Sequence, residues 1–278
     1  MFAASRYAAV RAWLGALVLA ALAGCQSVNT TSAGAVGVER SQLMSPLVSE
    51  ADLRKGSDQA YRQVLQQAQG KGTLNVDAAL TQRVRGIAAR IIPVTAAFRP
   101  DAPSWKWDVN VIRSDQLNAW CMPGGKIVFY SGLITKLQLT DDEIAAIMGH
   151  EIAHALREHA RERASEQQAA GLLIGIGAAA LGVGQVGADL STMAYKVAVG
   201  MPNSRAHETE ADRIGVELAA RAGYDPRAAM SLWQKMAQSG GGAPPEWLST
   251  HPAAATRQKD LEVYAARVMP LYEQARRK

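Results

Sequence analysis

Cysteine is nearly absent from this sequence of 278 residues, which contains only Cys25 and Cys121. Two cysteines are too few for a metal site built from thiolates alone, since such sites use three or four. We expect Cys25 to be modified, as described below, so that no disulfide forms within the chain. Cys121 then remains as a single thiol, which is safest when it is buried.

Strongly basic stretches are missing as well. The formal net charge of +5 comes from 30 Lys and Arg against 25 Asp and Glu, and the excess is spread along the chain. No cluster of Lys and Arg is interleaved with aromatic side chains, so nucleic-acid binding is not expected.

The N-terminal segment has the pattern of a bacterial lipoprotein signal. Arg6 and Arg11 precede an apolar run from Ala12 to Ala23, which is shorter than the ~20 residues of a transmembrane helix. The run ends in Leu-Ala-Gly-Cys, which resembles a lipobox, so we expect cleavage before Cys25 and acylation of that cysteine. Gln26 after the cysteine predicts sorting to the periplasmic face of the outer membrane rather than to the inner membrane.

The rest of the chain is expected to form one domain. We predict a signal peptide over residues 1–24, a flexible lipidated tether over residues 25–45 and a single domain over residues 46–278. Residues 49–69 and 77–98 have the apolar spacing of two amphipathic helices. Together with the short strands described below, they predict a fold that is mainly α with a small β-sheet.

One short motif carries candidate metal chemistry. In MGHEIAHALREH (residues 148–159), His150 and His154 are four residues apart, so on a helix both rings lie on one face and can bind one ion. Glu151 lies about 100° further round the helix, where its carboxylate can reach water in the ion's open position. Neutral imidazole suits Zn²⁺, so the motif predicts a zinc ion beside a general base. A solvated, charged helix face is the alternative.

The residues around this motif predict how its helix begins and ends. Thr140 followed by Glu143 has the spacing of a capping box. The apolar stripe of the helix consists of Leu139, Ile144, Ile147 and Met148. Residues 155–168 are polar and charged, so we expect the chain to emerge into solvent there, with His159 on the surface.

A catalytic zinc site needs a third protein ligand, and a second predicted helix offers one. In NSRAHETEADRIGVELAARAG (residues 203–223), Glu208 and Asp212 are four residues apart on one face. We expect Glu208 to complete the coordination and Asp212 to accept a hydrogen bond from a metal-binding histidine, which fixes the tautomer of that ring. His207 and Glu210 point elsewhere on the helix and are expected at the surface or rim.

Taken together, HExxH and SRAHETEAD resemble the zinc metallopeptidase family that contains HtpX and the CAAX prenyl proteases, in particular its soluble periplasmic branch, typified by LoiP and BepA. The resemblance covers about residues 50–270 and includes NAWCMPGGKIVFYSGLI and STHPAAATR. It implies a zincin-type domain in which the HExxH helix faces an ExxxD helix, with Glu208 as third zinc ligand and Asp212 as its supporting aspartate. Trp120, Cys121 and Met122 depart from the residues usual in this family.

The motif and the family resemblance imply one function. We expect a zinc-dependent endopeptidase of the bacterial envelope with one zinc per chain, in which Glu151 takes a proton from the activated water and passes it to the leaving amine. The expected substrates are misfolded or misassembled outer-membrane proteins, and the outer-membrane assembly machinery is an expected partner. The alternatives are a lipid-anchored chaperone with a structural or latent zinc site, and a hydrolase of a non-peptide amide of the cell wall.

Two short strands are predicted before the metal-binding helix. WKWDVNVIR (residues 105–113) alternates apolar and polar side chains, and KIVFYSG (residues 126–132) follows a tight turn at Gly124 and Gly125. An exposed strand edge there could bind an extended peptide by main-chain hydrogen bonds. The residues predicted to line this groove are Asn118, Ala119, Trp120 and Pro123. An ordinary hairpin beneath the helices is the alternative.

The loop before the last predicted helix has several open roles. His251 precedes Pro252 there, and it could stabilise an oxyanion, occupy the open position of the zinc or cap the helix. Arg257 could tether the loop.

Residues 169–190 are apolar and contain six glycines. A membrane span in this stretch would place the two zinc-binding helices on opposite membrane faces. We therefore expect a buried or groove-covering segment.

Overall fold

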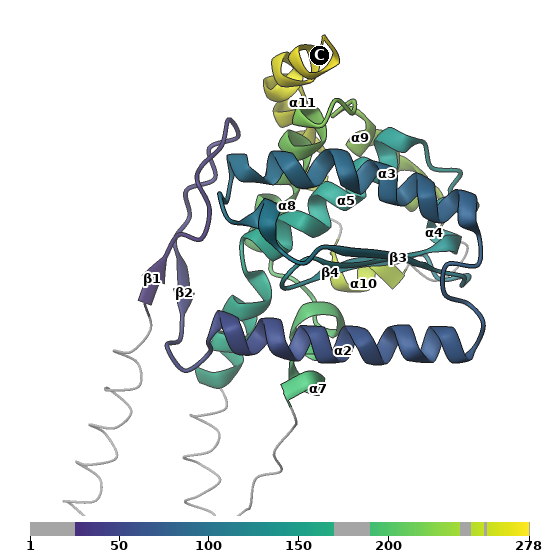
Figure 1. The fold of residues 1–278 in the computed structure, drawn as a ribbon. Coiled ribbons are helices and arrows are strands. Elements are labelled where there is room, and N and C mark those ends of the chain that lie inside the picture. Colours follow the sequence, from purple (N-terminus) through teal and green to yellow (C-terminus); the bar gives the residue numbers. More distant parts are fainter. Residues whose placement is uncertain (1–25, 170–189, 240–245, 253–254, 278) are drawn as a thin grey trace, which may run out of the picture.

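The computed structural model describes residues 26–169, 190–239, 246–252 and 255–277. These residues form helices around a small sheet (Figure 1), which confirms the predicted fold class, mainly α with a small β-sheet. The elements in chain order are β1 (Gln26–Val28), β2 (Gln42–Met44), α2 (Glu50–Gly70), α3 (Ala78–Val94), the 3₁₀ turns η1 (Thr95–Ala97) and η2 (Ala102–Ser104), β3 (Asp108–Ile112), β4 (Ala119–Met122), β5 (Lys126–Tyr130), α4 (Ser131–Lys136), α5 (Asp141–Leu156), a helix over residues 159–169, α7 (Leu190–Tyr195), the π-helical segment η3 (Lys196–Gly200), α8 (Arg205–Arg221), α9 (Ala228–Gln238), α10 (Glu246–Thr250) and α11 (Ala255–Arg276).

The main sheet has three strands in the order β3-β5-β4. β3 pairs with β5 in parallel, and β4 pairs with β5 as an antiparallel hairpin. The hairpin reverses at Gly124 and Gly125, whose φ angles of +84° and +82° are costly for residues with a side chain. The strand predicted over residues 105–113 begins only at Asp108, because Trp105 and Trp107 stack on each other beside η2 instead.

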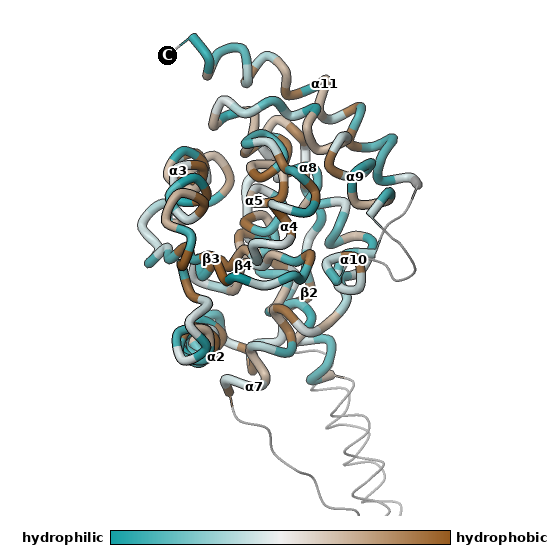
Figure 2. Tube along the Cα trace, turned by 90° about the vertical axis from the view of Figure 1, so that its right-hand side faces the viewer, coloured by the Kyte–Doolittle hydropathy of each residue, from teal (hydrophilic) through white to brown (hydrophobic). Residues whose placement is uncertain are grey.

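Both faces of this sheet are covered. Val111, Ile127 and Phe129 point into the main core with α3 and α5, whereas Trp120 and Val128 point toward α2. Figures 1 and 2 show α2 on one side of the sheet and α3 with α5 on the other. Helices on both faces make the sheet a rigid base beneath α5, the helix that carries the HExxH motif.

Helix α5 is buried on all sides. Thr140 accepts a hydrogen bond from the backbone of Glu143, whose carboxylate accepts one from the backbone of Thr140, so the predicted capping box is confirmed. Every residue of the helix from Glu143 to Leu156 is buried, because α3, α8, α9 and β4 surround it. A metal site on this helix is therefore held in the interior.

Helices α5 and α8 cross at two glycines. A Cβ atom built on Gly215 would lie 2.7 Å from the backbone nitrogen of His150 and 3.0 Å from the carbonyl carbon of Gly149. A Cβ atom on Gly149 would lie 2.6 Å from the carbonyl oxygen of Gly215. Only glycine permits this approach of two backbones, and the approach brings Glu208 of α8 next to the histidines of α5.

We expect Gly215→Ala to destabilise the protein although alanine favours helix. The new methyl group overlaps backbone atoms that cannot swing aside, which outweighs a propensity gain of about 1 kcal/mol and leaves a net loss of about 2 kcal/mol. Thermal unfolding should shift down by roughly 2–4 °C per kcal/mol. The matched control is Gly86→Ala in α3, where the added carbon meets no atom within 4 Å apart from its chain neighbours and the backbone of its own helix. An unchanged melting temperature for Gly215→Ala would show that the helices can separate without cost.

The predicted flexible tether is wrong for residues 26–45, which we call the N-terminal arm. Strands β1 and β2 pair within the arm, and Val36, Gln42 and Met44 are buried. The backbone N–H of Val36 donates to the carboxylate of Glu217 in α8, 2.9 Å away. The small polar composition of the arm suggested disorder, but its polar groups find buried partners on the domain.

The expectation of a solvent-exposed segment after the HExxH helix is also wrong. Arg157, His159, Glu162 and Arg163 are all buried. Their charges are compensated by distant residues: the carboxylate of Glu162, for example, accepts hydrogen bonds from Arg40 at 2.7 and 2.9 Å. Charged side chains can be buried when they are paired, and here the arm supplies the partners.

No helix among the described residues is long and apolar enough to span a bilayer. The predicted lipidation site, Cys25, and residues 170–189 of the predicted groove-covering segment lie outside the described residues.

Candidate metal centre

Four predicted site residues meet at one point in the interior. His150 and His154 come from α5, Glu208 from the first turn of α8, and His251 from the residue that follows α10. All four are buried, and each offers a nitrogen or oxygen atom within 4.8 Å of the others. The sequence separates these residues by up to 101 positions, so the fold assembles the cluster.

The distances within the cluster fit a tetrahedral ion. The Nε2 atoms of His150 and His154 are 3.1 Å apart, and the carboxylate oxygens of Glu208 lie 3.5 and 3.4 Å from them. Nδ1 of His251 lies 3.2 Å from Nε2 of His150 and 3.0 Å from Oε1 of Glu208. Ligands about 2.0–2.1 Å from a tetrahedral zinc ion lie about 3.3 Å from one another, so the donor set and its spacing both suit zinc.

The charge of the cluster also favours a cation. Burial acts to raise the pKa of Glu208. Electrostatic attraction to His251 and a hydrogen bond with His154 outweigh burial, so this pKa lies well below its usual value. Burial lowers the pKa of His154, which keeps that imidazole neutral and able to bind a metal. At His251, burial is outweighed by Glu208 and Glu151, so its pKa is raised and positive charge is stabilised at this place.

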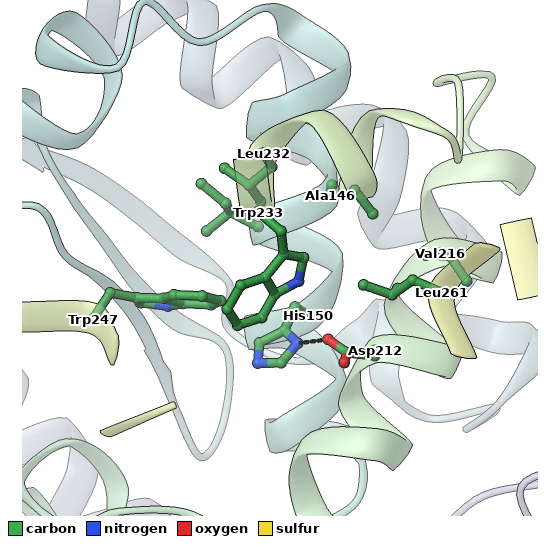
Figure 3. A pocket seen from close by; sticks show the side chains of 10 residues that line it. Ala146, His150, Asp212, Val216, Leu232, Trp233, Trp247 and Leu261 are labelled. Atoms are coloured by element: carbon green, nitrogen blue, oxygen red, sulfur yellow. Dashed lines mark hydrogen bonds and ion pairs between the residues drawn. The ribbon is translucent and has the colours of Figure 1, made fainter. Parts of the chain in front are cut away.

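The ring of His150 is held from behind by Asp212. Nδ1 of His150 lies 3.0 Å from Oδ1 of Asp212, the contact marked by the dashed line in Figure 3. Arg257 donates to both carboxylate oxygens of Asp212, at 2.6 and 2.7 Å, and its Nη1 lies 2.7 Å from Oε2 of Glu208. Because Nδ1 of His150 donates to the carboxylate, Nε2 keeps its lone pair and faces the cluster.

Glu151 lies beside the cluster rather than in it. Its Oε1 accepts a hydrogen bond from the indole of Trp247 at 2.8 Å and lies 3.4 Å from Nε2 of His251. Trp247 also stacks on His251, with ring centroids 4.6 Å apart. Figure 3 shows Trp247 and Trp233 close to His150. No sequence signal pointed to Trp247, because it reaches the site from a helix 96 residues further along the chain.

The loop that carries His251 is fastened from both sides. The backbone N–H of Asn203 donates to the carbonyl of Thr250 at 2.9 Å, and Arg257 donates to the carbonyl of Pro252, also at 2.9 Å. The hydrogen bond from Arg257 to Pro252 could hold the loop in place, which is the role proposed for Arg257 from the sequence. In this arrangement His251 occupies the fourth corner of the cluster.

The predicted groove residues lie near this loop. Ala119 and Trp120 are buried at the start of β4, an edge strand of the sheet, Asn118 is buried just before it, and Pro123 is half-buried in the following turn. Segment η3 packs along β4, and the backbone N–H of Trp247 in α10 donates to the carbonyl of Leu117 at 3.1 Å. The edge predicted to be exposed therefore has neighbours on the chain itself.

Three residues that were expected at the surface or rim, His159, His207 and Glu210, are buried behind the cluster instead. Nδ1 of His159 lies 2.7 Å from Nδ1 of His154, and Nε2 of His159 lies 3.0 Å from the carboxylate of Glu210. His207 stacks on His159 with ring centroids 4.3 Å apart. The expectation failed because spacing along one helix does not show which face a second helix covers.

An HExxH helix that faces an ExxxD helix, with its histidines and glutamate converging in the interior, defines the zincin-type metallopeptidase class. The sequence model of peptidase family M48 matches residues 78–265. The chain therefore belongs to peptidase family M48, which confirms the family predicted from the motifs.

Characterised relatives include mitochondrial proteases and bacterial ones. The mitochondrial metalloendopeptidase OMA1 of Arabidopsis thaliana is 38% identical over 156 residues, 56% of this chain and 31% of the relative. OMA1 of Schizosaccharomyces pombe is 31% identical over 211 residues, 75% of this chain and 60% of the relative. The beta-barrel assembly-enhancing protease of Escherichia coli K12 is 28% identical over 220 residues, 76% of this chain and 44% of the relative. The chain thus spans between 31% and 60% of the length of these relatives.

Proposed function

We propose that the protein is a zinc-dependent endopeptidase that binds one zinc ion per chain through His150, His154 and Glu208. The observation that carries the proposal is the convergence of these three side chains, from two helices, at distances that match tetrahedral ligation. Membership of a peptidase family supports the same activity.

The chemistry divides between the ion and the residues around it. Bound zinc supplies a Lewis acid that polarises the scissile carbonyl and makes water acidic enough to ionise near neutral pH. Glu151 takes the proton of the attacking water and returns it to the leaving amine. Asp212 and Arg257 hold the ring of His150 and the carboxylate of Glu208 in place, so the ligands need not reorganise during the reaction.

We further propose that His251 blocks this site in the closed arrangement. Its imidazole lies at the fourth ligand position, which water or a substrate carbonyl would need, and Trp247 donates a hydrogen bond to Glu151. A peptide reaches the site only after α10 and His251 move away from the cluster. The strand edge at Asn118, Ala119, Trp120 and Pro123 is then the surface we propose for an extended substrate.

The proposed substrates are misfolded or misassembled proteins of the bacterial envelope, with the outer-membrane assembly machinery as a proposed partner. Similarity to a protein named beta-barrel assembly-enhancing protease supports this setting, as does the lipobox-like sequence ending in Cys25. Acylation of Cys25 would anchor the protein at the periplasmic face of the outer membrane. Metabolic labelling with an alkyne fatty acid, compared between wild type and Cys25→Ala, tests the anchor, and equal labelling of the two would exclude it.

The test of the function is cleavage of a denatured model protein, with the products identified by mass spectrometry. New termini within the substrate chain are expected, together with their loss under a chelator and their return on adding zinc. Release of cell-wall amides without any protein cleavage would replace the proposal with the cell-wall hydrolase.

A further inference from the structure

His159 occupies an unusual place behind one of the metal-binding histidines. It begins the helix that follows α5, its side chain is fully buried, and both of its ring nitrogens have partners. Nδ1 lies 2.7 Å from Nδ1 of His154, and Nε2 lies 3.0 Å from Oε2 of Glu210. The three side chains form a line that ends at the metal centre.

The protons in this line can be assigned from its far end. Glu210 accepts a hydrogen bond from Nε of Arg157 at 2.9 Å and also contacts the guanidinium of Arg40. Paired with two arginines, its carboxylate acts only as a hydrogen-bond acceptor. Nε2 of His159 must then carry a proton and donate it. A neutral His159 has no second proton, so its Nδ1 is an acceptor.

The near end of the line gives the same assignment. Two ring nitrogens 2.7 Å apart need one proton between them, and since Nδ1 of His159 accepts, Nδ1 of His154 donates. Nε2 of His154 is left with a lone pair that faces Nε2 of His150 and the carboxylate of Glu208. The hydrogen bonds along this line therefore favour the tautomer of His154 with its proton on Nδ1, which is the tautomer that binds a metal through Nε2.

We propose that His159, oriented by Glu210, is a positioning residue that fixes the tautomer and ring orientation of His154 for metal binding. The inference rests on the proposed zinc site and extends it by one residue behind a ligand. Asp212 contacts His150 directly. Behind His154, the neutral ring of His159 lies between the ligand and the carboxylate of Glu210.

The N-terminal arm completes this support. Arg157 reaches the side chains of Asn29 and Thr31 at 2.7 and 3.2 Å and the carbonyl of Arg40 at 2.7 Å. Arg40 itself binds Glu210 and Glu162. The arm therefore holds Glu210 in the position from which it orients His159.

A second metal site in the same region does not fit the contacts. His159, Glu162 and His207 are close enough to share an ion, but both nitrogens of His159 are already engaged. The carboxylate of Glu162 is held by Arg40, Gln42 and His207. The rings of His159 and His207 lie 19° from parallel, so their nitrogens do not aim at a common point.

The test compares His159→Phe with the matched control His207→Phe, which replaces the other buried imidazole of the same stack, at a residue whose ring nitrogen contacts Glu162 and not a ligand. Zinc affinity is measured by competition with a chelator, and cobalt replaces zinc for the visible spectrum. We expect His159→Phe to weaken zinc binding by about 10- to 100-fold and to shift the cobalt bands, with little change in the control. His159→Asn, whose side-chain oxygen can accept near the position of Nδ1, should recover part of the loss.

The outcomes separate this inference from the proposed function. Wild type that binds no zinc would remove the proposed function itself. Wild-type zinc affinity in a folded His159→Phe, or two zinc ions per chain in wild type with one lost in that variant, would overturn the positioning role alone. Should His159→Phe fail to fold, ¹⁵N-histidine spectra of zinc-loaded wild type decide: a proton on Nε2 of His159 supports the role, and one on Nδ1 overturns it.

Discussion

Replacing Glu151 with glutamine is expected to lower proteolysis by about 1,000-fold or more while zinc content stays at one per chain. Loss of a general base costs about 10²–10⁴-fold, and a glutamine amide cannot take a proton from water. Glu151 is not a member of the metal-binding cluster, so the ligands remain in place. Glutamine has nearly the same size and still accepts the hydrogen bond from Trp247, so the fold should be kept. Single-turnover cleavage of a denatured protein, with zinc measured by elemental analysis, checks both halves of this expectation.

A matched control lies on the same helix. Glu143 is also a buried glutamate of α5, but it caps the helix, pairs with Lys235 at 2.6 Å and is not a member of the metal-binding cluster. Glu143→Gln should cost stability and leave cleavage below the melting temperature unchanged. Full proteolysis by Glu151→Gln would remove Glu151 as the base. Restoration of envelope integrity by an inactive Glu151→Gln variant would favour the lipid-anchored chaperone.

The parts of the site that the sequence predicted depend on short-range spacing. His150 and His154 share a face because any helix places residues four apart together, and Glu208 and Asp212 follow the same rule. The capping box is local too, since its two residues are three positions apart. Such features follow from helix geometry alone, and they needed no knowledge of how the helices pack.

The parts that the sequence did not predict depend on long-range pairing. A run such as residues 157–163 looks like a solvated surface, because no local feature shows that Arg40, more than 100 positions away, neutralises Glu162. The arm looked flexible for the complementary reason, since no local feature shows that Arg40 and Gln42 bind the buried carboxylate of Glu162. Each segment could be understood only with the other in place, so a reading of either one alone predicted solvent exposure.

The contact between Gly149 and Gly215 also depends on long-range packing, so the sequence did not predict it. Gly215 lies in a helix that the sequence predicted, but its contact with Gly149 depends on which part of α5 crosses it. The crossing places the two backbones in contact one residue before His150. The approach of two helices, more than the motif itself, sets the distance between the histidines and Glu208.

Replacing His251 with alanine is expected to raise cleavage of an unfolded protein by about 10- to 100-fold. In the closed arrangement, Nδ1 of His251 contacts the carboxylate of Glu208 at 3.0 Å, and its ring stacks on Trp247. A hydrogen bond to a charged group contributes about 1.5–3 kcal/mol, which corresponds to roughly a 10- to 100-fold change in an equilibrium constant. Loss of this bond therefore shifts the equilibrium toward the open arrangement by about that factor. The remaining three ligands match the number that a catalytic zinc site uses.

The opposite sign distinguishes the alternative role of the same residue. Were His251 to stabilise the oxyanion of the transition state, His251→Ala would lower cleavage by about 10²–10³-fold, with zinc retained. A companion variant, Trp247→Phe, keeps an aromatic ring against His251 but loses the hydrogen bond to Glu151, so a blocking loop predicts a gain in this variant too. An oxyanion role for His251 predicts no such gain, because the hydrogen bond that Trp247→Phe removes goes to Glu151 and not to His251. Measuring cleavage rate and zinc content for both variants separates a loop that closes the site from a histidine that takes part in the reaction.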